Sequence, residues 1–328
     1  MTNIHRAFLC LVIGFLTGVV LPGCDRSGPQ AGGDKGRSKR PRIALIMKAR
    51  TNPFFHTMEV GATQAAKELN VDLMVASVDL ETDFAKQAGL VENAISQGAE
   101  AILIAPADSK AIVTSLLDAQ HKGIRIINLD NRIDRESAQK VGLKVESFVG
   151  PDNEEGAYKA TKHLIARMGG AGKIALLAGI PGVDNAEQRK RGFLRAVDEV
   201  KDKVQLVASE SADWMTEPAQ RKMEGILSRH PDLNGVFAAN DNMALGAIQA
   251  IETAGKAGRI VVVGYDNLKA AQDAIRAGKM HGTIEQHPDR MGYKAVEVAV
   301  DLLNGKDVPK EVPTPTDLIT AETVKAGS

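Results

Sequence analysis

Cysteine is nearly absent from this 328-residue chain, which contains only Cys10 and Cys24. Both lie in the first 24 residues, so the remainder of the chain has neither a disulfide framework nor a cysteine-ligated metal site. The histidines from His56 onward show no ligand spacing on a common face. We therefore expect no metal site.

Motifs that carry enzymatic chemistry are also missing. The sequence has no G-x-S-x-G elbow, and the glycine-rich residues 169–172 lack the order of a phosphate-binding loop. The 41 basic side chains balance 41 acidic ones, so no net charge attracts nucleic acid. We expect a protein that is not an enzyme, needs no cofactor and binds no nucleic acid.

The start of the chain has the layout of an export signal. Arg6 precedes an apolar stretch, Ala7 to Leu21, that is short for a membrane span. The end of this stretch, Leu21-Pro22-Gly23-Cys24, resembles the lipobox of bacterial lipoproteins, whose cysteine is lipidated. We expect a signal peptide at 1–24, a flexible tether at 25–40 and a lipid anchor on Cys24 in the periplasm or cell envelope. An ordinary cleaved signal, the alternative, would also export the protein.

From Arg42 onward, short aliphatic runs alternate with segments of helical period, which is typical of βαβ units around parallel sheets. Met58 falls on the apolar face of the first such helical segment and is expected in the core. The pattern breaks near 150–153 and 287–288, where the chain is expected to cross between two lobes, with a third crossing near 316–320. The predicted strands cover residues 43–47, 71–78, 101–105, 124–129, 174–178, 204–208, 236–239 and 260–263.

Three of these predicted strands run into the same kind of polar corner. The corners are Leu129-Asp130-Asn131, Asn240-Asp241-Asn242 and Tyr265-Asp266-Asn267. Ligands of open α/β sheets bind beyond the carboxyl ends of the strands, so repeated carboxylates and amides there indicate one polar cleft. The alternative is that each Asp or Asn only caps the helix that follows it.

Aromatic and basic residues near other strand ends favour a sugar as the ligand. Asn52 and the rings of Phe54 and Phe55 follow the first strand, and aromatic faces pack on sugar C–H groups while polar groups bind the hydroxyls. Trp214, the only tryptophan, follows a later strand, and Arg189 lies about one turn after a glycine-rich loop. Each has a plain alternative as a core ring or a surface charge.

Together these motifs resemble the periplasmic sugar-binding proteins of the ribose-binding type, the solute receptors of ABC importers. The resemblance covers nearly everything from Arg42 to Thr320 and rests on Asn52-Pro53-Phe54-Phe55, Leu129-Asp130, Arg189 with Gly192-Phe193, residues 236–247 and Val263-Gly264-Tyr265-Asp266. It implies an α/β, type I periplasmic binding protein fold of two doubly wound parallel-sheet lobes joined by a three-segment hinge. The N-terminal lobe would comprise 41–150 with 287–316, and the C-terminal lobe 151–286 with 317–328.

The resemblance also implies a set of ligand-binding residues. Phe54, Phe55 and Trp214 would sandwich the sugar ring; Asp130 and Asp266 would accept hydrogen bonds; Asn52, Arg189, Asn240 and Gln286 would donate them. Ribose-binding members have Arg directly after the acid, whereas this chain has Asn131 there, which we include in the expected site, and then Arg132. Either Arg132 bends in as a substitute, or the shorter Asn131 widens the pocket for another pentose, hexose or polyol.

The implied function is capture of a monosaccharide or polyol by a monomer that delivers it to an ABC importer permease. A receptor that hands the closed form to a membrane signalling protein is an alternative. The effector domain of lac-repressor-type regulators shares the fold but is disfavoured, because an export signal stands where a helix-turn-helix would be.

Overall fold

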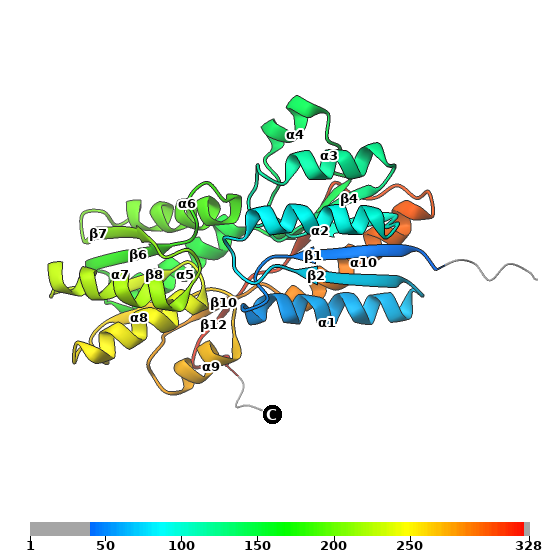
Figure 1. Cartoon of the computed structure of the whole chain (residues 1–328). Helices are drawn as coiled ribbons and strands as arrows, with labels where there is room; N and C mark the ends of the chain where they lie inside the picture. Colours follow the sequence, from blue (N-terminus) through cyan, green and yellow to red (C-terminus); the bar gives the residue numbers. More distant parts are fainter. Residues whose placement is uncertain (1–39, 325–328) are drawn as a thin grey trace, which may run out of the picture. The chain divides into compact units, whose positions relative to one another are not determined.

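The computed structural model describes residues 40–324. Two parallel β-sheets with helices on both faces make up the fold, as the sequence predicted (Figure 1). The predicted signal peptide, the lipobox cysteine Cys24 and nearly all of the predicted tether lie outside the described residues. Among those that are described, no helix is long and apolar enough to cross a bilayer.

The first sheet has six strands in the order β11-β5-β4-β3-β1-β2, and all neighbours pair in parallel. Parallel neighbours need crossover connections, which helices supply here. The strands are β1 (Arg42–Met47), β2 (Asp72–Ser77), β3 (Ala101–Ile104), β4 (Arg125–Leu129), β5 (Ser147–Pro151) and β11 (Glu311–Thr314). The helices around them are α1 (Pro53–Glu68), α2 (Phe84–Ser96), α3 (Val113–His121), α4 (Arg135–Val141) and α10 (Pro288–Leu303).

Both faces of this first sheet are buried. Ile43 and Leu45 of β1 pack with Met58 of α1 in one core cluster, whereas Ala44 and Ile46 belong to a second cluster with α2 and α3. This explains why β1 reads as a continuous apolar run instead of an alternating one. Full burial of each large aliphatic side chain stabilises the fold by about 1.5–3 kcal/mol.

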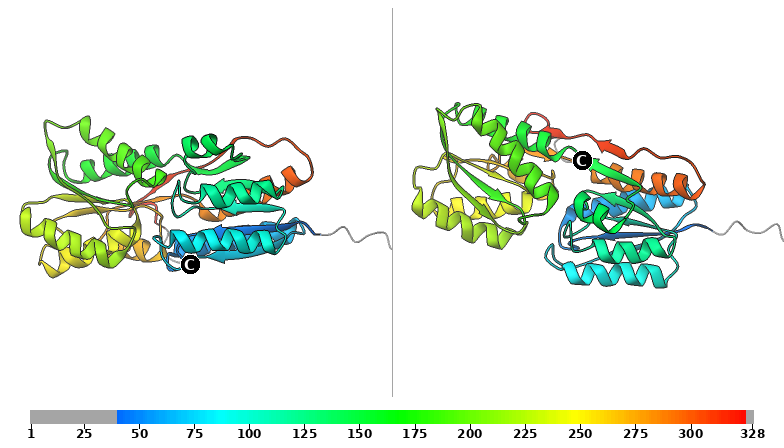
Figure 2. Two further views of the ribbon diagram at one scale, coloured as in Figure 1. Left: turned by 45° about the horizontal axis from the view of Figure 1, so that its top comes forward. Right: turned by 90° about the horizontal axis from the view of Figure 1, so that it is seen from above.

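The second sheet has four parallel strands in the order β7-β6-β8-β9. Its strands are β6 (Gly172–Ala178), β7 (Val204–Ser211), β8 (Gly235–Ala238) and β9 (Val261–Val263). Its helices are α5 (Asn153–Arg167), α6 (Asp184–Asp198), α7 (Thr216–Arg229), α8 (Asp241–Thr253) and α9 (Lys269–Arg276). The further views show helices on both faces of each sheet (Figure 2).

The parts of the molecule built on the first and on the second sheet are its two halves. The chain passes between them at three places. β5 leads into α5, β10 (Thr283–Glu285) leads into α10, and β11 leads into β12 (Asp317–Ile319), which pairs antiparallel with β10. An isolated bridge between Val263 and Gly282 ties this pair to the second sheet. The carboxyl ends of strands from both sheets therefore supply the loops between the halves.

Candidate ligand-binding site

A polar pocket lies between the two halves. Nine of the ten residues expected at the site line it, and three others join them. The expected ones are Asn52, Phe54, Phe55, Asp130, Arg189, Trp214, Asn240, Asp266 and Gln286, and the additional ones are Lys48, Glu81 and Asn185. Strand ends explain the gathering: Lys48 directly follows β1, Asp130 follows β4, and Gln286 follows β10.

Strained backbone is concentrated at this pocket. Asp130, Trp214 and Asp266 have φ angles of 57°, 66° and 121°, a region that side-chain-bearing residues rarely occupy. Each such residue costs of order 1–3 kcal/mol and persists only where its surroundings hold it. The fold thus maintains unfavourable backbone conformations at three residues whose side chains line the pocket.

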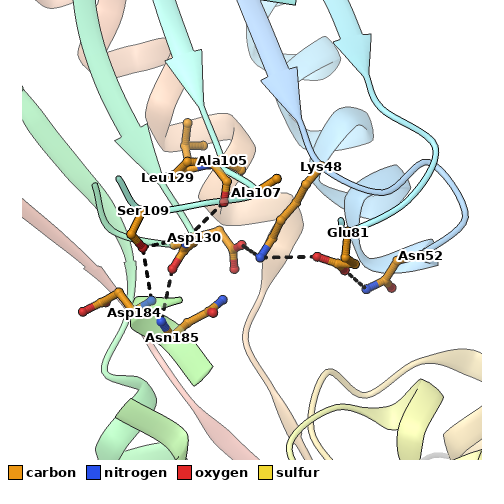
Figure 3. Close-up of polar contacts among 12 residues, drawn as sticks. Lys48, Asn52, Glu81, Ala105, Ala107, Ser109, Leu129, Asp130, Asp184 and Asn185 are labelled. Carbon is orange, nitrogen blue, oxygen red and sulfur yellow. Dashed lines mark hydrogen bonds and ion pairs between the residues drawn. The ribbon is translucent and has the colours of Figure 1, made fainter. Parts of the chain in front are cut away.

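A buried cation lies between two carboxylates on the first-sheet side of the pocket. Lys48 Nζ is 3.5 Å from Glu81 Oε2 and 3.5 Å from Asp130 Oδ2 (Figure 3). Asn52 Nδ2 donates to the other oxygen of Glu81, Oε1, at 3.2 Å. All three charged side chains are at most 7% exposed. Because water cannot solvate these charges, each charge is compensated by the opposite charges beside it.

On the second-sheet side, neighbours hold Arg189 in place. Its Nε donates to Asn153 Oδ1 at 2.9 Å, and its two terminal nitrogens donate to Ala239 O at 2.6 Å and Gln286 Oε1 at 3.1 Å. The guanidinium also lies 3.7 Å from the centroid of the Tyr265 ring. Because these contacts use three of the five N–H donors of the guanidinium, the side chain is oriented before any ligand arrives.

Asp266 faces this guanidinium, with its Oδ1 3.6 Å from Arg189 Nη1. Gln286 Nε2 donates to the same Oδ1 at 2.6 Å. Burial raises the pKa of Asp266 well above its ordinary value; Arg189 opposes this rise, and the nearby carboxylates, Asp241 first among them, add to it.

Four buried polar atoms of lining residues have no hydrogen-bond partner: Glu81 Oε2, Asp130 Oδ2, Asn185 Oδ1 and Trp214 Nε1. The two carboxylate oxygens have only the ion pairs with Lys48 at 3.5 Å. An unsatisfied buried polar group costs about 1–3 kcal/mol. Three of these atoms accept hydrogen bonds, and the indole nitrogen of Trp214 donates. The pocket is therefore complementary to a compact ligand that carries several donors and an acceptor.

Helix capping, the alternative explanation of the polar corners, holds for some of these residues. Asn52 Oδ1 accepts from Phe54 N at the start of α1, and Asn240 Oδ1 accepts from Met243 N at the start of α8. Both asparagines line the pocket as well. Asp130 and Asp266 cap neither α4 nor α9, whose capping positions are Asp134 and Leu268.

Asn131 and Arg132 do not line the pocket. Asn131 is fully buried, and its amide contacts Pro106, Ser109 and the backbone of Asn185 instead. Arg132 makes a two-pronged contact with Glu311, at 2.9 Å for each pair of atoms, and lies over the Phe148 ring. Of the two alternatives posed by the sequence, inward bending of Arg132 is not observed, and Lys48 is the cation beside Asp130.

Lys48, Glu81 and Asn185 are the lining residues that sequence reasoning missed. The strand-end rule that found Asp130 applies equally to Lys48, which follows the apolar run of β1. Glu81 stands in the loop between β2 and α2, and Asn185 in the first turn of α6, where no pattern distinguishes them from ordinary loop and helix residues. Within residues 40–324, no group of three or more His, Cys, Asp or Glu side chains is arranged to hold a metal ion.

The chain belongs to the family of periplasmic binding proteins, because the model of the periplasmic binding protein domain matches residues 43–307. A D-ribose/D-allose-binding protein of Pseudomonas aeruginosa is 37% identical over 314 residues, which cover 93% of this chain and 97% of that relative. The ribose import binding protein RbsB of Bacillus subtilis is 36% identical, with 94% and 97% covered.

Solved structures agree with this assignment. An ABC transporter periplasmic solute-binding protein from Actinobacillus succinogenes with bound D-allose has a TM-score of 0.83 and 41% identity, over 87% of this chain and 99% of that one. The ribose-type resemblance seen in the sequence is confirmed. Members of the family are solute-binding proteins, not enzymes, and membership implies an exported protein.

Proposed function

We propose that this protein captures an uncharged monosaccharide or polyol in the pocket between its two halves and delivers it to an ABC-type importer. One observation carries the proposal: the pocket combines buried acceptors that receive no hydrogen bond and an indole donor that makes none with three aromatic rings. Each hydroxyl of a sugar donates and accepts, and its C–H faces suit the rings of Phe54, Phe55 and Trp214. The relatives whose names specify ribose, allose and import support the same function.

The charges in the pocket argue against an anionic ligand. Glu81, Asp130 and Asp266 face two cations, Lys48 and Arg189. Even if the raised pKa of Asp266 keeps it protonated, the remaining carboxylates balance the cations, so a bound anion would find no uncompensated positive charge. A neutral polyhydroxylated ligand fits this balance.

We further propose that the moving units are 41–150 with 287–316, and 151–286 with 317–328. Lining residues come from both units, so a bound sugar contacts both at once only when they are close together. Binding would then shift an open-to-closed equilibrium about the three crossings, and a permease would recognise the closed form.

The lipid anchor is a separate part of the proposal and rests on the sequence Leu21-Pro22-Gly23-Cys24. We propose that Cys24 carries the lipid and that the protein is a monomer held at a membrane surface. Mass spectrometry of the N-terminal peptide should find the acylated cysteine. Cys24→Ser should move the protein from the membrane fraction to the soluble fraction; an unchanged membrane fraction would exclude the anchor.

A thermal-shift panel of pentoses, hexoses and polyols tests the ligand class. A sugar present at 100 times its Kd should add about 2.7 kcal/mol to the free energy of unfolding. Asp266→Ala should abolish that shift because it removes an acceptor from the pocket, whereas Glu136→Ala, at a carboxylate that is 77% exposed on α4, should retain it. If no sugar on the panel shifts the melting temperature, the proposed ligand class fails.

A further inference from the structure

Helix α6 begins without a capping side chain of its own. Its N-cap residue, Val183, makes no side-chain hydrogen bond to the first turn. The first backbone N–H groups of the helix instead donate to side chains of the other half. Asp184 N donates to Ser109 Oγ at 3.1 Å (Figure 3), and Asn185 N donates to Asn131 Oδ1 at 3.1 Å. A helix N-terminus needs such acceptors, and here they come from across the cleft.

The two acceptors are held in place by their own half of the molecule. Asn131 Nδ2 donates to Pro106 O at 3.0 Å and to Ser109 Oγ at 3.3 Å, and Asn128 Nδ2 donates to the backbone oxygen of Asn131 at 2.7 Å. Ser109 and Asn131 are 3% and 0% exposed. Since these bonds are local, both acceptors remain aimed when the halves separate, and only the contact with α6 is lost.

We propose that Ser109 and Asn131 form an interlobe latch: they cap α6 from the other half of the same chain and so stabilise the closed form through protein contacts alone. Neither residue lines the ligand pocket. The position after Asp130, where the ribose-binding pattern has Arg, therefore contacts the other half of the molecule instead of the pocket. The latch also acts on α6, the helix that carries Arg189 into the pocket.

The expected effect follows from the closing equilibrium, so this inference rests on the two-lobe capture proposed above. For a ligand that binds the closed form, the apparent Kd equals the intrinsic Kd of the closed form divided by the fraction of molecules that are closed. Loss of one cap contact should reduce the closed fraction, and raise the apparent Kd, by roughly 3–10-fold. Most of the change should appear as faster sugar release.

A double-mutant cycle across the cleft tests the latch. Ser109→Ala removes one acceptor, and Asp184→Pro removes the facing N–H at the first helical position, where proline fits the backbone. Each variant alone should raise the apparent Kd for the sugar found by the panel. The apparent Kd of the double variant should be no higher than the higher of the two single-variant values. If the fold-changes in apparent Kd caused by the two substitutions multiplied in the double variant, the substitutions would be independent and the latch would be overturned.

Lys269→Pro is the matched control, because Lys269 also opens a helix, α9, with an exposed side chain. In the variant that combines Lys269→Pro with Ser109→Ala, the fold-changes in apparent Kd should multiply, which shows that the two positions are not coupled. Because Asp184 lies in the other half, misfolding of the Ser109 variant leaves Asp184→Pro as an independent test: an unchanged Kd there would also overturn the latch.

Hydrogen exchange tests the latch even if no sugar on the panel binds. The amides of Asp184 and Asn185 should exchange more slowly in the unaltered protein than in Ser109→Ala. Equal exchange rates would overturn the latch, whereas failure of the sugar panel alone would overturn only the proposed ligand class.

Discussion

At the scale of single residues, the buried cation Lys48 is the group on which the first-sheet side of the pocket depends. It lies between Glu81 and Asp130, and its side chain is 4% exposed. Lys48→Met should reduce the free energy of unfolding by about 3 kcal/mol, because removing one partner leaves buried charges uncompensated. Urea denaturation measures this loss.

Lys140 provides the matched control for Lys48. It pairs with Glu136 at 2.7 Å, but its side chain is 69% exposed. Lys140→Met should therefore change the free energy of unfolding by less than about 1 kcal/mol. Equal losses in the two lysine variants would show that Lys48 is not electrostatically coupled to the two carboxylates.

Asp241 gives the protein a predictable pH dependence. It is fully buried and accepts from Leu268 N at 2.8 Å and Thr283 Oγ1 at 2.7 Å. Burial raises its pKa to about 7 although these hydrogen bonds oppose the rise. Between about pH 4, the unfolded pKa, and about pH 7, the folded state binds the proton more tightly, so this contribution to stability is full below pH 4 and is lost as the pH rises to 7.

Asp241→Asn should make the decline in stability between pH 4.5 and 7.5 shallower, because an amide does not titrate and still reaches both partners. Urea denaturation at several pH values measures the slope. Asp301→Asn, at a carboxylate that is 43% exposed on α10, should keep the slope of the unaltered protein. A slope unchanged by Asp241→Asn would contradict the assignment to Asp241.

Sequence reasoning found the position, at the pocket, of residues that follow a strand end. Asp130, Asn240 and Asp266 were predicted because parallel strands bring their carboxyl ends to one edge. Asn131 differs from Asp130 by one position, but its side chain contacts the other half, 54 positions away at Asn185. No local pattern encodes the direction of such a side chain.

At the scale of secondary-structure elements, a close contact between α1 and α10 ties residues 288–303 to the first sheet. A Cβ added at Gly292 would lie 2.1 Å from Met58 O, and one added at Gly61 would lie 1.9 Å from Asp289 O. The helices therefore touch through their backbones. Gly292→Ala should reduce the free energy of unfolding by about 1–3 kcal/mol by forcing them apart.

Gly89→Ala is the control for this contact. Gly89 lies in α2 and has no heavy atom within 4 Å of an added Cβ. The substitution there should stabilise the protein by about 0.5–1 kcal/mol, because alanine favours a helix over glycine. Opposite signs for the two variants in thermal denaturation support the close contact, and equal signs would contradict it.

Strands that form uninterrupted aliphatic runs were predictable even when short, as β9 shows, whereas β11 was not. Each of the eight predicted strand runs overlaps an observed strand. β11 was missed because it contains Pro313 and spans only Glu311–Thr314, which the structure places at a sheet edge where proline is tolerated. The return of α10 to the first sheet did not follow from periodicity, since an apolar face does not specify its partner; the glycine contact with α1 does.

At the scale of the whole molecule, capture of a ligand should make the protein more compact. The lining residues belong to both halves, and the latch contacts at Ser109 and Asn131 form only when the halves are close. Small-angle scattering should show a smaller radius of gyration when the sugar identified by thermal shift is added at saturation. A sugar that gives no thermal shift should leave the radius unchanged.

Trp214 provides a second signal from the same closure. It is the only tryptophan in the chain, it lines the pocket, and its Nε1 has no hydrogen-bond partner. A bound hydroxyl that accepts from this nitrogen changes the polarity around the indole, so the emission should shift over the same sugar concentrations that reduce the radius of gyration. An emission shift without compaction would place the sugar in the pocket but contradict closure of the two halves, because the rings and acceptors of one half would then hold the ligand alone.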